Sequence, residues 1–199
     1  MGHAQDERFF RRILSGDLIE AERGEVEKKN YHFISKTPLY EIDLNRDGKN
    51  EAISYEIKDG ENWFYVYSGA DAKKILFSQK LEVAGKEANL FKIAVRDISS
   101  SVRVMLLFFY EGNSQYLEFN GTGRVYVVTW EHNDLKTLSM IKGPAFWQER
   151  EERNRGYYQR QYEVELFDFN KDKIKEIVVK HGFITRVLMY LGKGNWRQL

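Results

Sequence analysis

A short polar stretch, DLNRDGKNE at residues 43 to 51, has the residue types and the spacing of a calcium-binding loop. Ca²⁺ takes about six to eight oxygen ligands, and acidic or amide side chains at alternate positions of a tight loop can converge on one ion. The expected ligands are the side-chain oxygens of Asp43, Asn45, Asp47 and Glu51 and the main-chain carbonyl of Lys49. One alternative stays open, in which these side chains only accept hydrogen bonds from the amides of their own turn.

The same pattern returns near the end of the chain, where DFNKDKIKE occupies residues 168 to 176. An alignment without gaps matches the four oxygen-bearing side chains of the first loop with Asp168, Asn170, Asp172 and Glu176. Lys173 stands where the first loop has Gly48, and a left-handed turn there costs a non-glycine residue roughly 1–2 kcal/mol. We therefore expect a calcium ion at the first loop and a weak or empty metal site at the second.

A weaker third copy lies between them in VRDISSSVRVMLLFFYEG, with Asp97, Ser99 and Ser101 at the first three ligand positions. Its later carboxylates are missing. The stretch is either a repeat unit that has lost its ion or an ordinary polar turn that begins at Asp97, and the sequence leaves both interpretations open.

The elements around these loops are expected to be strands. From residue 31 onward, short runs of aromatic and β-branched residues alternate with glycine, asparagine and aspartate, which is typical of successive antiparallel strands. The most apolar run, VMLLFFY at residues 104 to 110, predicts a core strand. Two helices are expected, one over residues 5–23 and a short one from Pro144 to Gly156.

Together, the loop and the strand that follows it resemble the calcium-binding repeat of FG-GAP or VCBS-type proteins, which form integrin-α-like β-propellers. The resemblance covers residues 40–82 and 163–199. It implies blade-like units, an extracytoplasmic location and a role in adhesion or ligand display. The expected fold is therefore mainly β, with about three antiparallel units that resemble propeller blades, an incomplete propeller, and an N-terminal helix.

The expected organisation is one β-rich domain over residues 31–199, with repeat-like units near residues 39–82, 90–141 and 158–199. Residues 1–30 would form a leader, the N-terminal helix and a charged connector. Met1 to His3 resemble an added leader before a mature N-terminus, which predicts a periplasmic or extracellular protein whose signal peptide has been removed. Because three blades are too few to close a ring, either the two helices cover the open sheet or the chain completes itself by self-association, and we expect the first, which would leave a monomer.

Composition argues against several classes of function. A net charge of +1 gives no general attraction for nucleic acid, and no apolar run approaches the roughly 20 residues of a membrane span. There is no cysteine, and the four histidines are scattered without the spacing of zinc ligands. No catalytic motif appears, so we expect a protein that is not an enzyme.

Two functions remain. The first is a calcium-stabilised module for protein interaction or assembly in the bacterial envelope. The alternative is a glycan-binding or adhesion module that stacks exposed aromatic rings on sugars. Trp147, beside the charged run, is the expected exposed ring for that alternative.

Overall fold

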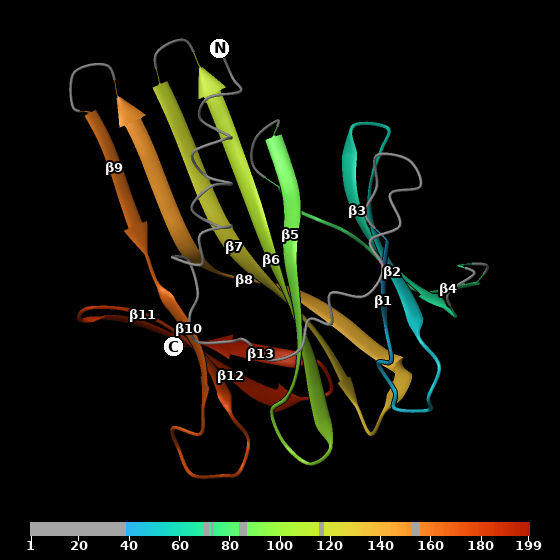
Figure 1. Ribbon diagram of the computed structural model, residues 1–199. Helices are drawn as coiled ribbons and strands as arrows, with labels where there is room; N and C mark the ends of the chain where they lie inside the picture. The colour runs from blue at the N-terminus through green and yellow to red at the C-terminus, as the bar shows by residue number, and fades with distance from the viewer. Residues whose placement is uncertain (1–38, 70–71, 73, 84–86, 116–117, 153–155) are drawn as a thin grey trace.

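The computed structural model describes residues 39–69, 72, 74–83, 87–115, 118–152 and 156–199, and in these ranges every regular element is a β-strand (Figure 1). The mainly β, antiparallel fold predicted from the sequence is thereby confirmed. The predicted leader, the helix over residues 5–23 and the charged connector lie outside the described residues. Within the described ranges, no helix has the length and apolar character needed to cross a membrane.

The strands form three sheets, and in each sheet neighbouring strands follow one another in the sequence. The first sheet contains β1 (Leu39–Ile42), β2 (Glu51–Lys58), β3 (Glu61–Ser68) and β4 (Lys74–Lys80). The middle sheet contains β5 (Glu87–Asp97), β6 (Val102–Gln115), β7 (Glu118–Glu131), β8 (Asp134–Glu152) and β9 (Gly156–Gln161). The last sheet contains β10 (Glu163–Phe167), β11 (Glu176–His181), β12 (Ile184–Gly192) and β13 (Asn195–Gln198).

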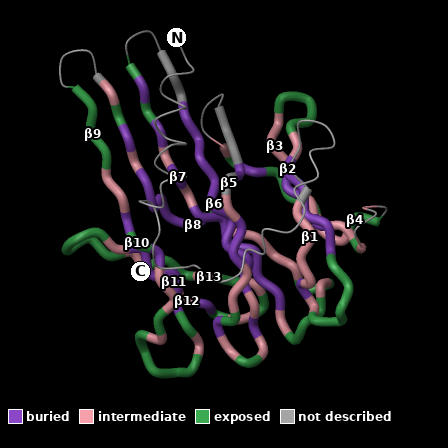
Figure 2. Tube along the Cα trace, viewed as in Figure 1, coloured by how far each residue is buried: buried purple, intermediate pink, exposed green. Residues whose placement is uncertain are grey.

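Strand β6 is the centre of the packing because both of its faces are buried (Figure 2). Side chains alternate between the two faces of a strand, so neighbouring residues of the run VMLLFFY enter different cores. Val104, Leu106 and Phe108 belong to one hydrophobic cluster, together with residues of the last sheet. The other cluster joins the first sheet to the opposite face of β6 through Met105, Leu107 and Phe109.

Each outer sheet covers one face of the middle sheet. The first sheet contributes Ile53, Tyr55, Phe64 and Val66 to one cluster. The last sheet contributes Val164, Ile177, Val179, Leu188 and Tyr190 to the other. Because burying a large apolar side chain stabilises a fold by about 1.5–3 kcal/mol, these two clusters account for the face-to-face stacking of the three sheets.

The helix predicted from Pro144 to Gly156 is wrong, because β8 runs from Asp134 to Glu152 and β9 begins at Gly156. Pro144 lies where the pairing of β7 with β8 shifts register, and this part of β8 pairs only with β7. A proline is tolerated at such a position because no partner strand needs its missing N–H. The charged run then continues as strand, with Trp147 and Glu149 buried and Arg150 exposed.

Substitutions in β6 test the double burial. Leu106 and Leu107 are 0% and 1% exposed, and each lies in a different core, so Leu106→Ala and Leu107→Ala should each lower the free energy of unfolding by about 2–5 kcal/mol. Ile57→Ala is the control, because Ile57 is 65% exposed and its loss should stay within about 0.5 kcal/mol. Urea unfolding curves measure all three. A loss at only one of the two leucines would show that one outer sheet does not pack on β6.

Candidate functional site

The two predicted calcium loops occupy the same place in the two outer sheets. Residues 43–50 connect β1 to β2 in the first sheet, and residues 168–175 connect β10 to β11 in the last sheet. In both cases the loop joins the first two strands of a sheet, and the closing glutamate is the first residue of the second strand. The equivalence seen in the sequence is therefore also an equivalence of position in the fold.

In the first loop, side-chain oxygens accept hydrogen bonds from the loop's own amides. The Asp47 amide donates to Asn45 Oδ1 (3.0 Å) and the Lys49 amide to Asp47 Oδ1 (2.8 Å). The Gly48 amide donates to Asp43 Oδ2 (3.0 Å), which folds the tip of the loop back on its start. Glu51 Oε2 accepts from the Leu44 amide (2.8 Å) and holds the two ends together.

The second loop repeats this frame. Asp172 and Ile174 amides donate to Asn170 Oδ1 (3.0 Å) and Asp172 Oδ1 (2.7 Å), and the Phe169 amide donates to Glu176 Oε2 (2.8 Å). The backbone angles agree as well, with φ of 62° at Arg46 and 61° at Lys171. Lys173 has a φ of 72°, so it adopts the left-handed conformation that Gly48 adopts at 82° in the first loop.

The loops differ at the first aspartate. Asp43 Oδ1 is buried and has no hydrogen-bond partner. The corresponding Asp168 Oδ1 accepts a bond from the Asp172 amide (3.1 Å), while Asp168 Oδ2 accepts from the Lys173 amide (3.0 Å). An unsatisfied buried acceptor costs about 1–3 kcal/mol. The first loop thus has an oxygen that a cation could satisfy, and the second loop uses both oxygens of its first aspartate internally.

Negative charge accumulates in the first loop. Burial raises the pKa of the Glu51 carboxyl, and the charges of Asp47 and Asp43 act in the same direction, against the hydrogen bond from the Leu44 amide. The pKa of Asp47 is lowered, first by the hydrogen bond from the Asn45 side chain and then by that from the Lys49 amide. These carboxylates are therefore close enough to repel one another, and a cation among them would reduce that repulsion.

In the part of the chain that the structure describes, no three His, Asp or Glu side chains are gathered closely enough to hold a metal ion by themselves. A cation in the first loop would therefore also need the amide oxygen of Asn45 and the carbonyl of Lys49. Both belong to the ligand set expected from the sequence.

The third, degenerate copy lies in the middle sheet, where β5 ends at Asp97 and β6 begins at Val102. The Asp97 carboxylate meets two guanidinium groups, since Arg46 Nη2 lies 2.5 Å from Oδ2 and Arg103 Nε lies 3.0 Å from Oδ1. Ser99 Oγ accepts bonds from the amides of Ser101 (3.3 Å) and Val102 (3.1 Å). Arginine side chains thus supply the positive charge at Asp97, and the serine forms an ordinary turn.

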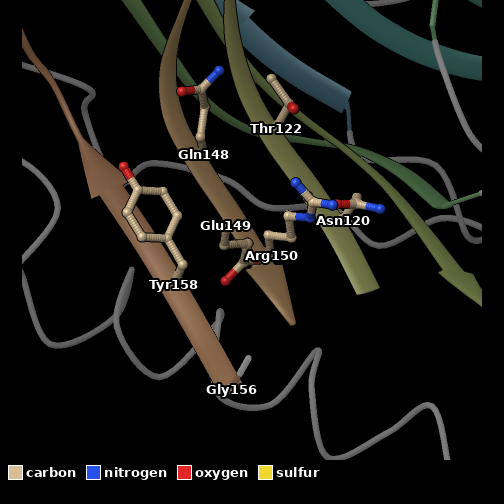
Figure 3. A pocket seen from close by; sticks show the side chains of 8 residues that line it. Asn120, Thr122, Gln148, Glu149, Arg150, Gly156 and Tyr158 are labelled. Atoms are coloured by element: carbon tan, nitrogen blue, oxygen red, sulfur yellow. The ribbon is translucent and has the colours of Figure 1, made fainter. Parts of the chain in front are cut away.

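A second feature, which the sequence did not indicate, is an open polar pocket of about 420 Å³ on the middle sheet (Figure 3). Its lining comes from three adjacent strands: Asn120, Gly121 and Thr122 from β7, Gln148, Glu149 and Arg150 from β8, and Gly156 and Tyr158 from β9. Arg150 pairs with both Asn120 and Tyr158 in the strand register, which brings amide, guanidinium and aromatic groups side by side.

A buried carboxylate adjoins this pocket. Glu149 is 6% exposed, and it accepts hydrogen bonds from the hydroxyl groups of Tyr110 (2.8 Å) and Tyr157 (2.5 Å). Gly121 makes room for this arrangement, because a Cβ atom there would overlap the Tyr110 hydroxyl. The sequence carried little signal for these residues, because FWQEREE has two apolar residues followed by five polar ones and shows no strand-like alternation.

Trp147 does not have the exposed position predicted for a ligand-binding ring. It is 2% exposed and belongs to the cluster between the middle and last sheets. The prediction was wrong because Trp147 lies inside strand β8, where Phe146 shares its cluster and Glu149 is buried as well.

Comparisons of the chain with models of known families, with curated proteins and with solved structures find no match. The two loops and the pocket are therefore the features from which the function of the chain is inferred.

Exchanging the residues at the tips of the two loops tests the backbone difference between them. Gly48→Lys should lower the free energy of unfolding by about 1–2 kcal/mol, because nothing lies within 4 Å of a Cβ atom there and only the left-handed conformation is penalised. Lys173→Gly should have the opposite sign and a smaller size, since glycine also gives the unfolded chain about 0.4–1 kcal/mol of additional freedom. Urea unfolding in EDTA measures both. Destabilisation by both substitutions would contradict the assignment of a strained left-handed backbone to Lys173.

Proposed function

We propose that this chain is a non-catalytic, calcium-stabilised β-repeat protein of the FG-GAP or VCBS type, with sheets that correspond to propeller-like blades. The observation that carries the proposal is the buried, unpartnered Oδ1 atom of Asp43 inside a loop frame that the chain builds twice. A repeated frame supports a common origin for the two loops. The unpartnered oxygen in only one of them supports an ion in that loop alone.

The donors in the first loop suit calcium. Carboxylate, amide and carbonyl oxygens are hard ligands, and Ca²⁺ accepts six to eight of them in flexible geometry. Asp43, Asn45, Asp47, Lys49 and Glu51 would hold the ion, and three carboxylates against one dication would leave about one negative charge. The second loop, with Asp168, Asn170, Asp172 and Glu176, would bind weakly because its first aspartate is already satisfied and Lys173 adds positive charge.

The first loop joins two sheets, and this supports a structural role for the ion. The Leu44 carbonyl accepts hydrogen bonds from Arg103 and from the Trp130 indole (3.1 Å), both in the middle sheet. Arg46 of the same loop pairs with Asp97 at the end of β5. An ion that fixes the loop would therefore also fix the contact between the first and middle sheets.

Such a scaffold fits a module for protein interaction or assembly in the periplasm or outside the cell. Calcium sites of extracellular modules have dissociation constants of about 10⁻⁴–10⁻³ M, which suits a small, mostly exposed loop. The interaction would use the surfaces of the sheets, while the ion would keep those surfaces in a fixed arrangement.

A second candidate function, glycan binding, is favoured by the pocket on the middle sheet. Tyr158 is 48% exposed at its edge, next to the side chains of Arg150, Gln148 and Asn120. An aromatic ring can stack on the C–H face of a sugar, and amide and guanidinium groups can bind its hydroxyl groups. We place this candidate at Tyr158 because the buried Trp147 cannot serve it.

Calcium should stabilise the folded chain through the first loop. A ligand at about one hundred times its dissociation constant adds roughly 2.7 kcal/mol, so thermal unfolding should shift upward in calcium relative to EDTA. Asp43→Asn keeps an acceptor for the Gly48 amide but removes the charge, and it should abolish the shift. Asp168→Asn is the matched control and should leave the shift in place.

The proposal fails if the wild-type chain, after confirmed removal of metal, unfolds at the same temperature in EDTA and in calcium. It also fails if Asp168→Asn abolishes the shift while Asp43→Asn does not. Magnesium at the same concentration serves as the control for a general effect of divalent salt.

For the second candidate, binding of the purified chain to a glycan array should be lost in Tyr158→Ala and retained in Phe183→Ala. Phe183 is a fully exposed aromatic residue in the turn between β11 and β12, outside the pocket lining, so it controls for nonspecific contact through an aromatic ring. Circular dichroism should show unchanged strand content in both variants. An array without signal for the wild-type chain would remove this candidate.

A further inference from the structure

The three sheets are stacked in one direction, with unlike faces in contact. Aligning the two loops makes Ala52, Ile53 and Ser54 of β2 equivalent to Ile177, Val178 and Val179 of β11. We call the face that carries Ile53 or Val178 the leading face of its sheet, and the face that carries Ala52 or Ile177 the trailing face. The first sheet packs on the middle sheet through its leading face, whereas the last sheet does so through its trailing face.

The residue that follows the first aspartate of each loop shows the same direction of stacking. Leu44 is 0% exposed and lies in the cluster between the first and middle sheets. Ile98 is 1% exposed and lies in the cluster between the middle and last sheets. The equivalent Phe169 is 69% exposed. A side chain that is covered by the next sheet in two units is uncovered in the third, where the described residues supply no further sheet.

Other large apolar side chains of the last sheet are exposed too, although Val178 on its leading face is 7% exposed. Phe167 is 57% exposed and lies on the same face as Val178, because Glu165, two residues before Phe167, pairs with Val178. Leu191 is 58% exposed and lies at the register shift of β12 that follows Tyr190, whose ring enters the core. This surface, made by Phe167, Phe169 and Leu191, has the apolar character of the faces that are buried elsewhere in the stack.

The opposite end of the stack carries the trailing face of the first sheet, where part-buried rings lie beside the buried Ala52 and Ser54. Its rings lie on β3, where Trp63 stacks on Tyr65 (6.2 Å between ring centroids) and Tyr65 on Tyr67 (5.7 Å). These rings share the face of Ala52 and Ser54, because Tyr67 pairs with Ala52 and Tyr65 with Ser54. Ile75, which pairs with Tyr67, is 52% exposed on the same face.

We propose that a second copy of this chain covers these faces, with the leading face of the last sheet of one copy packed on the trailing face of the first sheet of the other. Both contacts inside the chain are of this leading-to-trailing kind, so the new contact continues an interface that the chain already makes twice. A head-to-tail contact closes when the rotation allows it. Two copies bring six sheets together, within the range of about four to eight at which stacked sheets close into a ring.

This dimer differs from the monomer that the sequence favoured, whose predicted N-terminal helix lies outside the described residues. That expectation relied on the N-terminal helix and on a helix from Pro144 to Gly156 to cover the open sheet. The second of these segments is part of β8 and β9 and belongs to the middle sheet itself.

Size-exclusion chromatography with light scattering on the full chain tests the proposal. The expected mass is twice the 23.6 kDa of one chain. Phe169→Glu on the leading face and Tyr65→Arg on the trailing face should each give a monomer. Phe183→Glu is the matched control, because Phe183 is fully exposed in the turn between β11 and β12, and it should leave the dimer intact. Circular dichroism and thermal unfolding confirm that each variant is folded.

Mixing the two monomeric variants distinguishes this contact from a symmetric one. A chain with Phe169→Glu retains its trailing face, and a chain with Tyr65→Arg retains its leading face, so the mixture should form a heterodimer through one intact contact. A monomeric wild-type chain would overturn the proposal. So would a dimer that survives either Phe169→Glu or Tyr65→Arg, or a mixture that stays monomeric.

Discussion

Burial of both faces of β6 is the constraint on which the rest of the structure depends. A strand with the sequence VMLLFFY has no polar face to offer solvent, so each face needs a covering layer. The first sheet covers the face of Met105, Leu107 and Phe109, and the last sheet covers the opposite face. The chain order reflects this requirement, because the most apolar strand lies in the middle unit and the more polar units lie on either side of it.

The loops that follow the first strand of the first and middle units both contact the next sheet, but they do so through different groups. In the middle unit, the guanidinium groups of Arg46 and Arg103 supply positive charge to Asp97, and Arg103 also donates to the Leu44 carbonyl of the first sheet. The contact of this loop with the last sheet is a backbone hydrogen bond, in which the Lys175 amide donates to the Ile98 carbonyl (2.8 Å). The first loop has an unpartnered aspartate oxygen, and this difference underlies our proposal of an ion there.

Local pattern failed in one short stretch whose composition suggested a helix although the chain forms a strand there. PAFWQEREERNRG contains a proline followed by a charged run, which favours a helix, and it has no alternation of apolar and polar residues that would indicate a strand. The neighbouring strand β7 decides between the two by offering a partner for β8. Its glycines then admit bulky groups, since a Cβ atom at Gly123 would lie 2.8 Å from both Phe146 and Trp147. Burial of Trp147 and Glu149 is a consequence of that pairing.

The sequence by itself determined the strand class, the core strand at β6 and the equivalence of the two outer loops, because periodicity, turn residues and ligand spacing are local properties. It also indicated the strained backbone of Lys173, since a repeat transfers its turn geometry from one copy to the next. Only the tertiary structure decided which oxygens of Asp43 and Asp168 are satisfied and which three strands form the polar pocket. It also placed Phe169 in the open although Leu44 and Ile98 are covered. These properties depend on what packs against a residue from elsewhere in the chain, and no local pattern records that.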